Sequence, residues 1–284
     1  MRKLIKQLVS STAKNPIAWA VYRMCGKLAG QLSQVHGHAR LVRQESARDE
    51  TVARIAQELF PDPQVSSGPF KGLRYPGLQS VGSMLLPKLL GSYESELHAP
   101  LEALLRKNYS AIVNIGCAEG YYAVGLALRC PDAIVHAFDT DDKARSLCGA
   151  MAQVNGVAGR VRIGSLCDPT LLCSIPLGGK GLIICDCEGY EADLFNDQVV
   201  QHLSDHHVVV ETHDFVNIDI SVNLRDRFRR THEIRSVKST HDIEKAHTYR
   251  YPQLDRFNTN ERFLILSERR PAIMEWLVMT PKAN

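Results

Sequence analysis

One stretch near the middle of the chain limits the possible folds more than any other. It begins with the apolar run Ala111–Ile115, which is typical of a strand buried on both faces. A Gly-x-x-x-Gly turn follows, and Tyr121–Arg129 then has the small residues of a helix that packs closely on a sheet. A second apolar run, Ala133–Phe138, ends in Asp139. This order of a strand, a glycine turn, a helix, a second strand and an acid predicts the first half of a dinucleotide-type α/β site.

The turn and the acid also indicate a ligand. Gly116 and Gly120 would let the backbone approach a ligand where a Cβ would clash. Asp139, 19 residues after Gly120, would accept the two hydroxyls of an adenosine ribose. The turn lacks the third glycine of the GxGxxG fingerprint, and Glu119 would repel a pyrophosphate but suit an ammonium and a sulfonium. This pattern favours S-adenosylmethionine over NAD, although a Gly-x-x-x-Gly segment alone can be a tight turn without a ligand.

Strands and helices alternate along the rest of the chain. Six or seven strands separated by helices predict a largely parallel, Rossmann-like, doubly wound sheet with both faces covered. In such a fold the loop after the third strand covers an adenine ring, so Ser165 and Leu166 join the expected site. The further strands are predicted at residues 160–163, 181–186, 207–211, 233–238 and 263–267. The expected cofactor-binding residues are Asn114, Gly116, Cys117, Ala118, Glu119, Gly120, Tyr121, Asp139, Thr140, Ser165, Leu166 and Asp186.

Length and composition limit the domain organisation and the cellular location that we expect. With 284 residues, the chain can form one large α/β domain and a smaller extension. We predict an N-terminal helical extension at 1–65, a connecting or cover segment at 66–98 and the domain that would bind S-adenosylmethionine at 99–284. A net charge of +3 is too small to imply nucleic acid, and no run approaches the roughly 20 apolar residues of a membrane span. Eight cysteines without a CxxC, and no signal peptide, indicate a cytoplasmic protein.

The N-terminal extension allows three interpretations. Apolar residues recur at helical spacing up to residue 60, but residues 31–50 are polar and form either a connector or a solvated helix. The helices could pack on their own domain, join a second copy into a homo-oligomer, or lie on an anionic membrane surface. The first two interpretations need no lipid and are simpler.

Three segments resemble the FkbM-type methyltransferases, a group of class I S-adenosylmethionine-dependent methyltransferases. Ile112–Tyr122 is similar to the Val-Asp-Val-Gly-Ala-x-x-Gly-Tyr-Tyr of that family, and Ile184–Glu191 to its Ile-Asp-x-Glu-Gly-x-Glu. Val209–His213 is similar to its apolar strand that ends in Glu and often His. The resemblance implies a seven-stranded sheet with an antiparallel last strand, and methylation of a hydroxyl on a sugar or natural product. Asn114, where the family has Asp, and Glu119 depart from its pattern.

Two strand ends predict the chemistry of the site. Asp186 and Glu188 are two residues apart, as are Glu211 and His213, so each pair shares a face if its strand continues. Deprotonation of an alcohol needs a base, and a neutral imidazole with a reference pKa of about 6.5 is suitable. We therefore expect His213 to be the base, with Glu188 and Glu211 as catalytic carboxylates that bind the acceptor or orient His213.

A metal site is an alternative at the same position. Asp186, Glu211 and His213 would offer ligands that suit Mg²⁺ or Mn²⁺, and a metal would acidify a bound hydroxyl directly. Close carboxylates need a neutralising charge in either case, which a proton, a metal or the sulfonium could supply.

The predicted function is therefore S-adenosylmethionine-dependent O-methylation of a hydroxyl on a small polar molecule, either a saccharide or a secondary metabolite. Two other functions stay open. An NAD-dependent oxidoreductase would need the missing glycine and a catalytic Tyr-x-x-x-Lys. A scaffold that binds the cofactor without turnover would fit the unusual Asn114 and Glu119.

Overall fold

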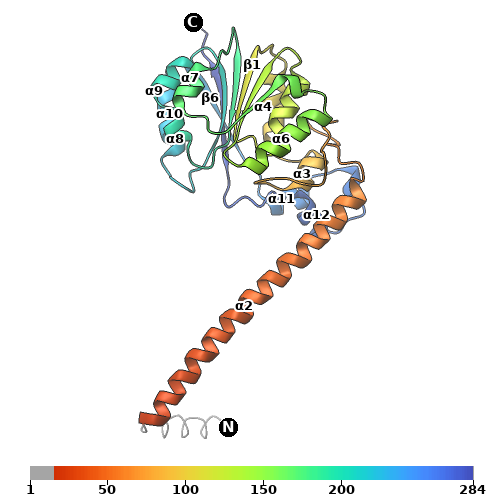
Figure 1. Ribbon diagram of the computed structural model, residues 1–284, viewed down its shortest axis with the longest axis vertical. Coiled ribbons are helices and arrows are strands. Elements are labelled where there is room, and N and C mark those ends of the chain that lie inside the picture. Colours follow the sequence, from red (N-terminus) through yellow and green to blue (C-terminus); the bar gives the residue numbers. More distant parts are fainter. Residues whose placement is uncertain (1–15, 284) are drawn as a thin grey trace. The chain divides into compact units, whose positions relative to one another are not determined.

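The structure is a computed structural model that describes residues 16–283 (Figure 1). The chain forms two compact units that meet in sequence between Arg54 and Ile55. The first contains most of α2 (Pro16–Leu59), and the second contains the last residues of α2 and everything after it. Residues 55–98, predicted as the end of the extension and a connecting segment, thus belong to the same unit as the sheet.

Helix α2 runs without interruption through the polar stretch 31–50, which is therefore a helix and not a connector. The sequence has no proline between Pro16 and Pro61, so no backbone hydrogen bond of the helix is lost before its end. No helix in residues 16–283 is long and apolar enough to cross a membrane. The helix predicted before residue 16 lies outside the described residues.

Seven strands form one sheet in the described part of the chain, in the order β3-β2-β1-β4-β5-β7-β6. Strands β1 to β5 pair in parallel, whereas β7 is antiparallel to both β5 and β6. This arrangement confirms the predicted α/β class and the antiparallel last strand. The strands are β1 (Ala111–Ile115), β2 (Ile134–Phe138), β3 (Val161–Gly164), β4 (Gly181–Cys185), β5 (His207–Thr212), β6 (His232–Lys238) and β7 (Glu275–Pro281).

Helices cover both faces of the sheet. In Figure 1, α4 and α6 lie on one face, and α7, α8, α9 and α10 lie on the other. The doubly wound architecture predicted from the alternating pattern is therefore present. The helices of this unit are α3 (Leu85–Leu90), α4 (Ser95–Leu105), α5 (Tyr121–Arg129), α6 (Asp142–Val154), α7 (Pro169–Ser174), α8 (Glu191–Leu194), α9 (Asp197–His202), α10 (Ile220–Phe228), α11 (Asp242–Thr248) and α12 (Thr259–Leu266), with short 3₁₀ turns at Ala158–Arg160 and Pro252–Leu254.

The prediction for the last strand is wrong in its position. Residues 263–267 were predicted as a strand, but 263–266 form the second half of α12. That helix begins with a capping box, in which the side chains of Asn258 and Glu261 each bond the other's backbone N–H. The last strand is β7, whose residues Trp276–Met279 are buried between β5 and β6. An Asn-x-x-Glu signal ahead of an apolar run predicts a helix start, and it was overlooked.

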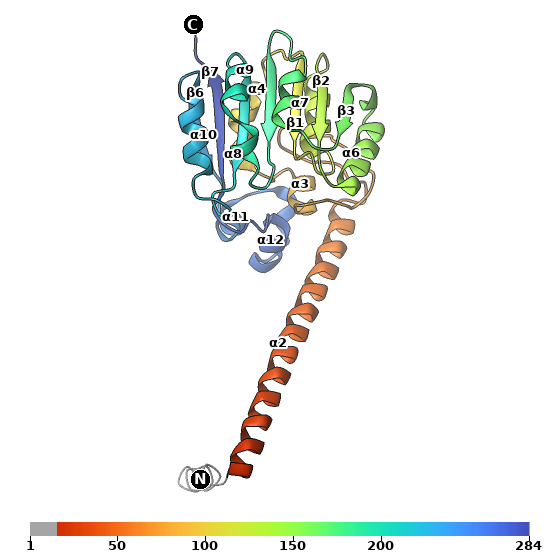
Figure 2. The same cartoon turned by 60° about the vertical axis from the view of Figure 1, so that its left-hand side comes forward.

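The register of the parallel strands sets where their last residues lie. Ile115 pairs with both Phe138 and Cys185, so the residues after β1, β2 and β4 lie level with one another. Cys185 also pairs with Val210, which places Asp186 beside Glu211. The insertion between β6 and β7, which contains α11 and α12, lies with α3 at one end of the sheet (Figures 1 and 2).

Candidate active site

A cleft of about 490 Å³ opens at the carboxyl ends of β1, β2, β4 and β5. Pockets for small ligands have volumes of roughly 300–1,000 Å³, and open α/β sheets bind ligands at this edge. Part of the predicted site lines the cleft. These residues are Gly116, Ala118, Asp139, Thr140, Ser165, Leu166, Asp186, Glu188, Glu211 and His213.

The two glycines of the turn are required by the protein's own packing. Gly116 has a φ of +76°, and a Cβ there would lie 1.6 Å from the carbonyl oxygen of Asp186. Gly120 has a φ of +104°, and its Cβ would lie 3.0 Å from Sγ of Cys148. A side chain at Gly116 would therefore push β1 and β4 apart. The sequence predicts that both glycines let a ligand approach the backbone, but only Gly116 lines the cleft.

Asp139 fixes the turn from the end of β2. Its Oδ2 accepts a hydrogen bond of 2.8 Å from the N–H of Ala118, a non-glycine residue with a φ of +46°. Its Oδ1 accepts one of 2.9 Å from the N–H of Asp141. A carboxylate offers about four acceptor positions, so these two bonds leave room for two ribose hydroxyls.

Five predicted cofactor residues lie behind the cleft surface. They are Asn114, Cys117, Glu119, Gly120 and Tyr121, all buried and absent from the lining. Asn114 donates from Nδ2 to the carbonyl of Ile184 at 3.4 Å, which ties β1 to β4. Glu119 forms an ion pair with Lys88, so the cation beside it comes from the chain and not from the ligand. These side chains support the turn from inside.

His213, just after β5, is oriented by Glu191. Its Nδ1 lies 2.7 Å from Oε1 of Glu191, which is fully buried and also accepts the N–H groups of Cys187 and Gly189. Burial raises the pKa of the Glu191 carboxyl, but the hydrogen bond and charge of His213 outweigh it and leave that pKa lowered. Glu191 is therefore ionised and accepts the Nδ1 proton, which leaves Nε2 as the nitrogen that can take a proton in the cleft.

Two further carboxylates face that nitrogen. Nε2 of His213 lies 3.4 Å from Oδ1 of Asp186 and 3.4 Å from Oε2 of Glu188. Burial alone would lower the pKa of His213, but Glu191, Asp186 and Glu188 outweigh it and raise that pKa above its usual value. Glu188 is mostly exposed, with 75% of its side chain accessible, so it lies at the mouth of the cleft.

Asp186 differs from the other carboxylates of the cleft. Its Oδ1 is buried and has no hydrogen-bond partner among the described residues. Burial, with the nearby charge of Glu94, raises the pKa of Asp186 to about 7, although His213 opposes the change. Asp186 is thus poised to accept a hydrogen bond or to sit beside a cation.

Arg270 neutralises the neighbouring carboxylate. Its guanidinium forms ion pairs with Glu211 and Glu94, and its Nε donates to Glu268 at 2.8 Å. Burial and the charge of Asp186 raise the pKa of Glu211, while Arg270 acts against this increase. The neutralising charge that the sequence required is therefore supplied by an arginine that no sequence motif indicated.

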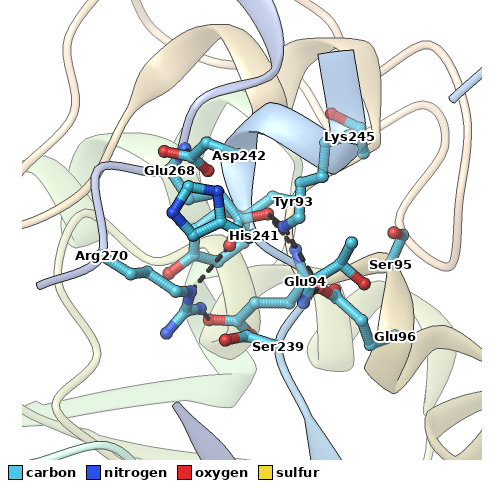
Figure 3. Close-up of polar contacts among 12 residues, drawn as sticks. Tyr93, Glu94, Ser95, Glu96, Ser239, His241, Asp242, Lys245, Glu268 and Arg270 are labelled. Atoms are coloured by element: carbon cyan, nitrogen blue, oxygen red, sulfur yellow. Dashed lines mark hydrogen bonds and ion pairs between the residues drawn. The ribbon is translucent and has the colours of Figure 1, made fainter. Parts of the chain in front are cut away.

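The ion pairs continue away from the cleft (Figure 3). Lys245 of α11 is fully buried and pairs with Glu268 and, at 3.3 Å, with Glu96. The N–H of Glu94 also donates to Glu268 at 3.0 Å. This cluster of Glu94, Glu96, Lys245, Glu268 and Arg270, which we call the Arg270 network, ties the insertion after β6 to the start of α4.

The predicted metal ligands do come close together. Asp186, Glu211 and His213 each offer a ligand atom, and these atoms lie within 4.8 Å of one another. Two oxygens and one imidazole suit Mg²⁺ or Mn²⁺. The ion pair between Glu211 and Arg270 competes with this role, because the guanidinium would repel a divalent cation.

Several residues that line or support the cleft were not predicted. Arg270 and Met274 line it, together with Val81, Gly82 and Ser83. Glu191 was within the recognised Asp-x-Glu-Gly-x-Glu segment, so a signal existed although its role did not follow from it.

No protein-family model matches the chain, and no curated protein sequence does. Some solved structures are similar in fold. Precorrin-6y C5,15-methyltransferase from Geobacter metallireducens has a TM-score of 0.43 at 14% identity, covering 65% of this chain and 87% of that one. Precorrin 8w decarboxylase from Methanobacterium thermoautotrophicum has a TM-score of 0.43 at 17% identity, covering 65% of this chain and 89% of that one. Geranyl diphosphate methyltransferase in complex with S-adenosylmethionine has a TM-score of 0.39 at 13% identity, covering 70% of this chain and 89% of that one. These similarities concern the fold alone, so we infer function from the cleft.

Proposed function

We propose that this chain is a cytoplasmic, S-adenosylmethionine-dependent O-methyltransferase of class I, of the FkbM type. One observation supports the proposal above the others. A single cleft has Asp139 and the glycine turn at one end and the Glu191–His213 pair at the other. A nucleoside-binding acid and an oriented base therefore face the same space.

The lining of the cleft suits the proposed cofactor in its hydrogen-bond acceptors and its charge. Asp139 would accept the ribose hydroxyls, the backbone of Gly116 and Ala118 would follow the ligand, and apolar Phe138 and Leu166 would flank the adenine. When bound, S-adenosylmethionine supplies a methyl group already activated by a sulfonium. The lining contains five carboxylates but only two arginines, so a cationic ligand is favoured.

The residues of the other end would activate the acceptor. Nε2 of His213 takes the proton of a hydroxyl, while Glu191 holds Nδ1 and stabilises the imidazolium that forms. Oxygens of Asp186 and Glu188, both 3.4 Å from Nε2, can accept hydrogen bonds from neighbouring hydroxyls of the acceptor. These acceptors favour a polyhydroxylated substrate, either a saccharide or a secondary metabolite.

Calorimetry with S-adenosylhomocysteine tests the proposal. We expect saturable binding, and the absence of heat at high ligand excess would contradict the proposal. A melting assay separates the rival functions, because an oxidoreductase would be stabilised by NADH and not by the methyl donor. Binding without turnover over a broad panel of hydroxyl compounds would instead support a non-catalytic scaffold.

A metal-dependent form of the same reaction is the second candidate, supported by the closeness of Asp186, Glu211 and His213. A chelator should then abolish turnover, and Mg²⁺ or Mn²⁺ should restore it. We favour the metal-free form because Arg270 already neutralises Glu211. Full activity in the presence of a chelator is therefore the expected result.

A further inference from the structure

Part of the cleft is lined by residues 80–83, a segment distant in sequence from the glycine turn that we call the cover. Val81, Gly82 and Ser83 line the cleft, yet they belong to an irregular segment before α3. Two hydrogen bonds hold this segment: Oγ of Ser80 donates to Glu119 at 3.0 Å, and the N–H of Val81 donates to Glu119 at 3.1 Å. The cover is thus attached to the glycine turn through one side chain.

That side chain is a buried charge with a complete set of partners. Lys88 pairs directly with Glu119, and the two side chains are only 2% and 1% exposed. Tyr75 donates to Glu119 at 3.2 Å, and Lys88 also donates to Ser80 at 3.3 Å. Burial would raise the pKa of Glu119, but Lys88 and the N–H of Val81 outweigh it and lower that pKa. Glu119 therefore stays ionised and keeps all these bonds.

The position of Glu119 in the chain links the cover to the nucleoside site. It directly follows Ala118, which lines the cleft and donates its N–H to Asp139. The turn therefore faces the cofactor with Ala118 and holds the cover with the next residue. A change in the position of residues 80–83 would therefore alter Glu119 and, next to it, the backbone of Ala118 in the proposed cofactor half.

We propose that Glu119 is a positioning residue that holds residues 80–83 over the cofactor, so that its carboxylate sets cofactor affinity without taking part in methyl transfer. The inference rests on the proposed function. It gives a role to a residue that had been expected to bind the cofactor directly.

The variant Glu119→Gln tests it, because glutamine keeps the size of the side chain but loses its charge. We expect S-adenosylhomocysteine to bind 10- to 30-fold more weakly in calorimetry. Hydrogen exchange of the amides at 79–84 should become faster. In turnover assays the KM for the methyl donor should rise while kcat changes less than twofold. A purely structural defect that reduces the fraction of folded enzyme would instead lower the apparent kcat and leave KM unchanged.

Matched variants make the result decisive. Glu102→Gln breaks an ion pair with Arg129 whose side chains are 37% and 36% exposed, and it should leave affinity and exchange unchanged. Should Glu119→Gln fail to fold, the double variant K88M/E119Q removes both buried charges and is expected to show the same weaker binding. Wild-type affinity with unchanged exchange at 79–84, in either folded variant, would overturn the inference. Failure of the wild-type chain to bind would instead refute the proposed function.

Discussion

The two halves of the cleft are built in different ways. In the cofactor half, the glycine turn and Asp139 are close in sequence and are joined by the N–H of Ala118, which donates to the Asp139 carboxylate. In the acceptor half, charged side chains from distant segments meet, and Arg270 binds both Glu94 and Glu211. The link between the glycine turn and Asp139 is therefore specified locally, whereas the acceptor half exists only after the whole chain has folded.

This difference predicts different responses to mutation. A buried charge that loses its partner costs several kcal/mol, whereas the hydrogen bond that joins the glycine turn to Asp139 is donated by a backbone N–H, which most substitutions leave in place. Changes in the acceptor half should thus affect stability and rate. Changes at the glycine turn and at Asp139 should mainly affect affinity.

The largest expected effect is that of Arg270→Met. The variant leaves Glu94 and Glu211 buried without their cation, which should lower the free energy of unfolding by about 3–5 kcal/mol. Urea unfolding at pH 8 measures it. The loss should shrink toward pH 5, because burial raises the pKa of both carboxyls and they take up protons there.

Arg225→Met provides the control for that prediction. Arg225 pairs with Glu275 at 2.7 Å, but its side chain is 37% exposed. The control should therefore lose less than about 1 kcal/mol. Equal losses in the two variants would remove the distinction between a buried network and a surface ion pair.

His213→Ala should come next. Loss of the base should lower the rate at least ~100-fold, about 2.7 kcal/mol, while the affinity for S-adenosylhomocysteine stays the same. Glu191→Gln should cost less, about tenfold. It should also move the rise of rate with pH to lower pH, because Glu191 raises the pKa of His213. Unchanged turnover in His213→Ala would exclude that residue from the mechanism.

The smallest of these effects concerns Asp186. Its pKa is about 7 in the folded protein and about 3.9 in an unfolded chain, so the folded state binds more protons between these values. Stability from this group is therefore present below pH 4 and lost as pH rises through 7. Asp186→Asn should be more stable than wild type at pH 8 by about 1–2 kcal/mol, with a smaller difference at pH 5. A less stable variant at pH 8 would contradict the assignment.

The same division explains what the sequence could predict. Strand β1, the turn, helix α5 and Asp139 follow one another, and spacing alone placed them correctly. Asp186 and His213 could be placed because each lies at or just past the carboxyl end of a predicted strand, and parallel strands bring their ends together. The register then brought the three proposed metal ligands close together.

The unpredicted parts depend on contacts between distant residues. Arg270 lies in a loop before β7, and nothing in the residues around it indicates that Glu94 and Glu211 surround it. The position of Glu119 in the glycine turn suggested a cationic ligand as its partner, but its partner is Lys88, 31 residues earlier. The misplaced last strand had a different cause, since the capping signal at Asn258 was in the sequence.

The central claim is that the cofactor half binds an adenosyl sulfonium compound through Asp139 and the glycine turn. A crystal structure grown with S-adenosylhomocysteine tests it most directly. We predict that the ribose hydroxyls lie within hydrogen-bonding distance of Asp139 and that the backbone of Gly116 and Ala118 follows the ligand. A ligand bound elsewhere, or Asp139 turned toward bulk water, would contradict the claim.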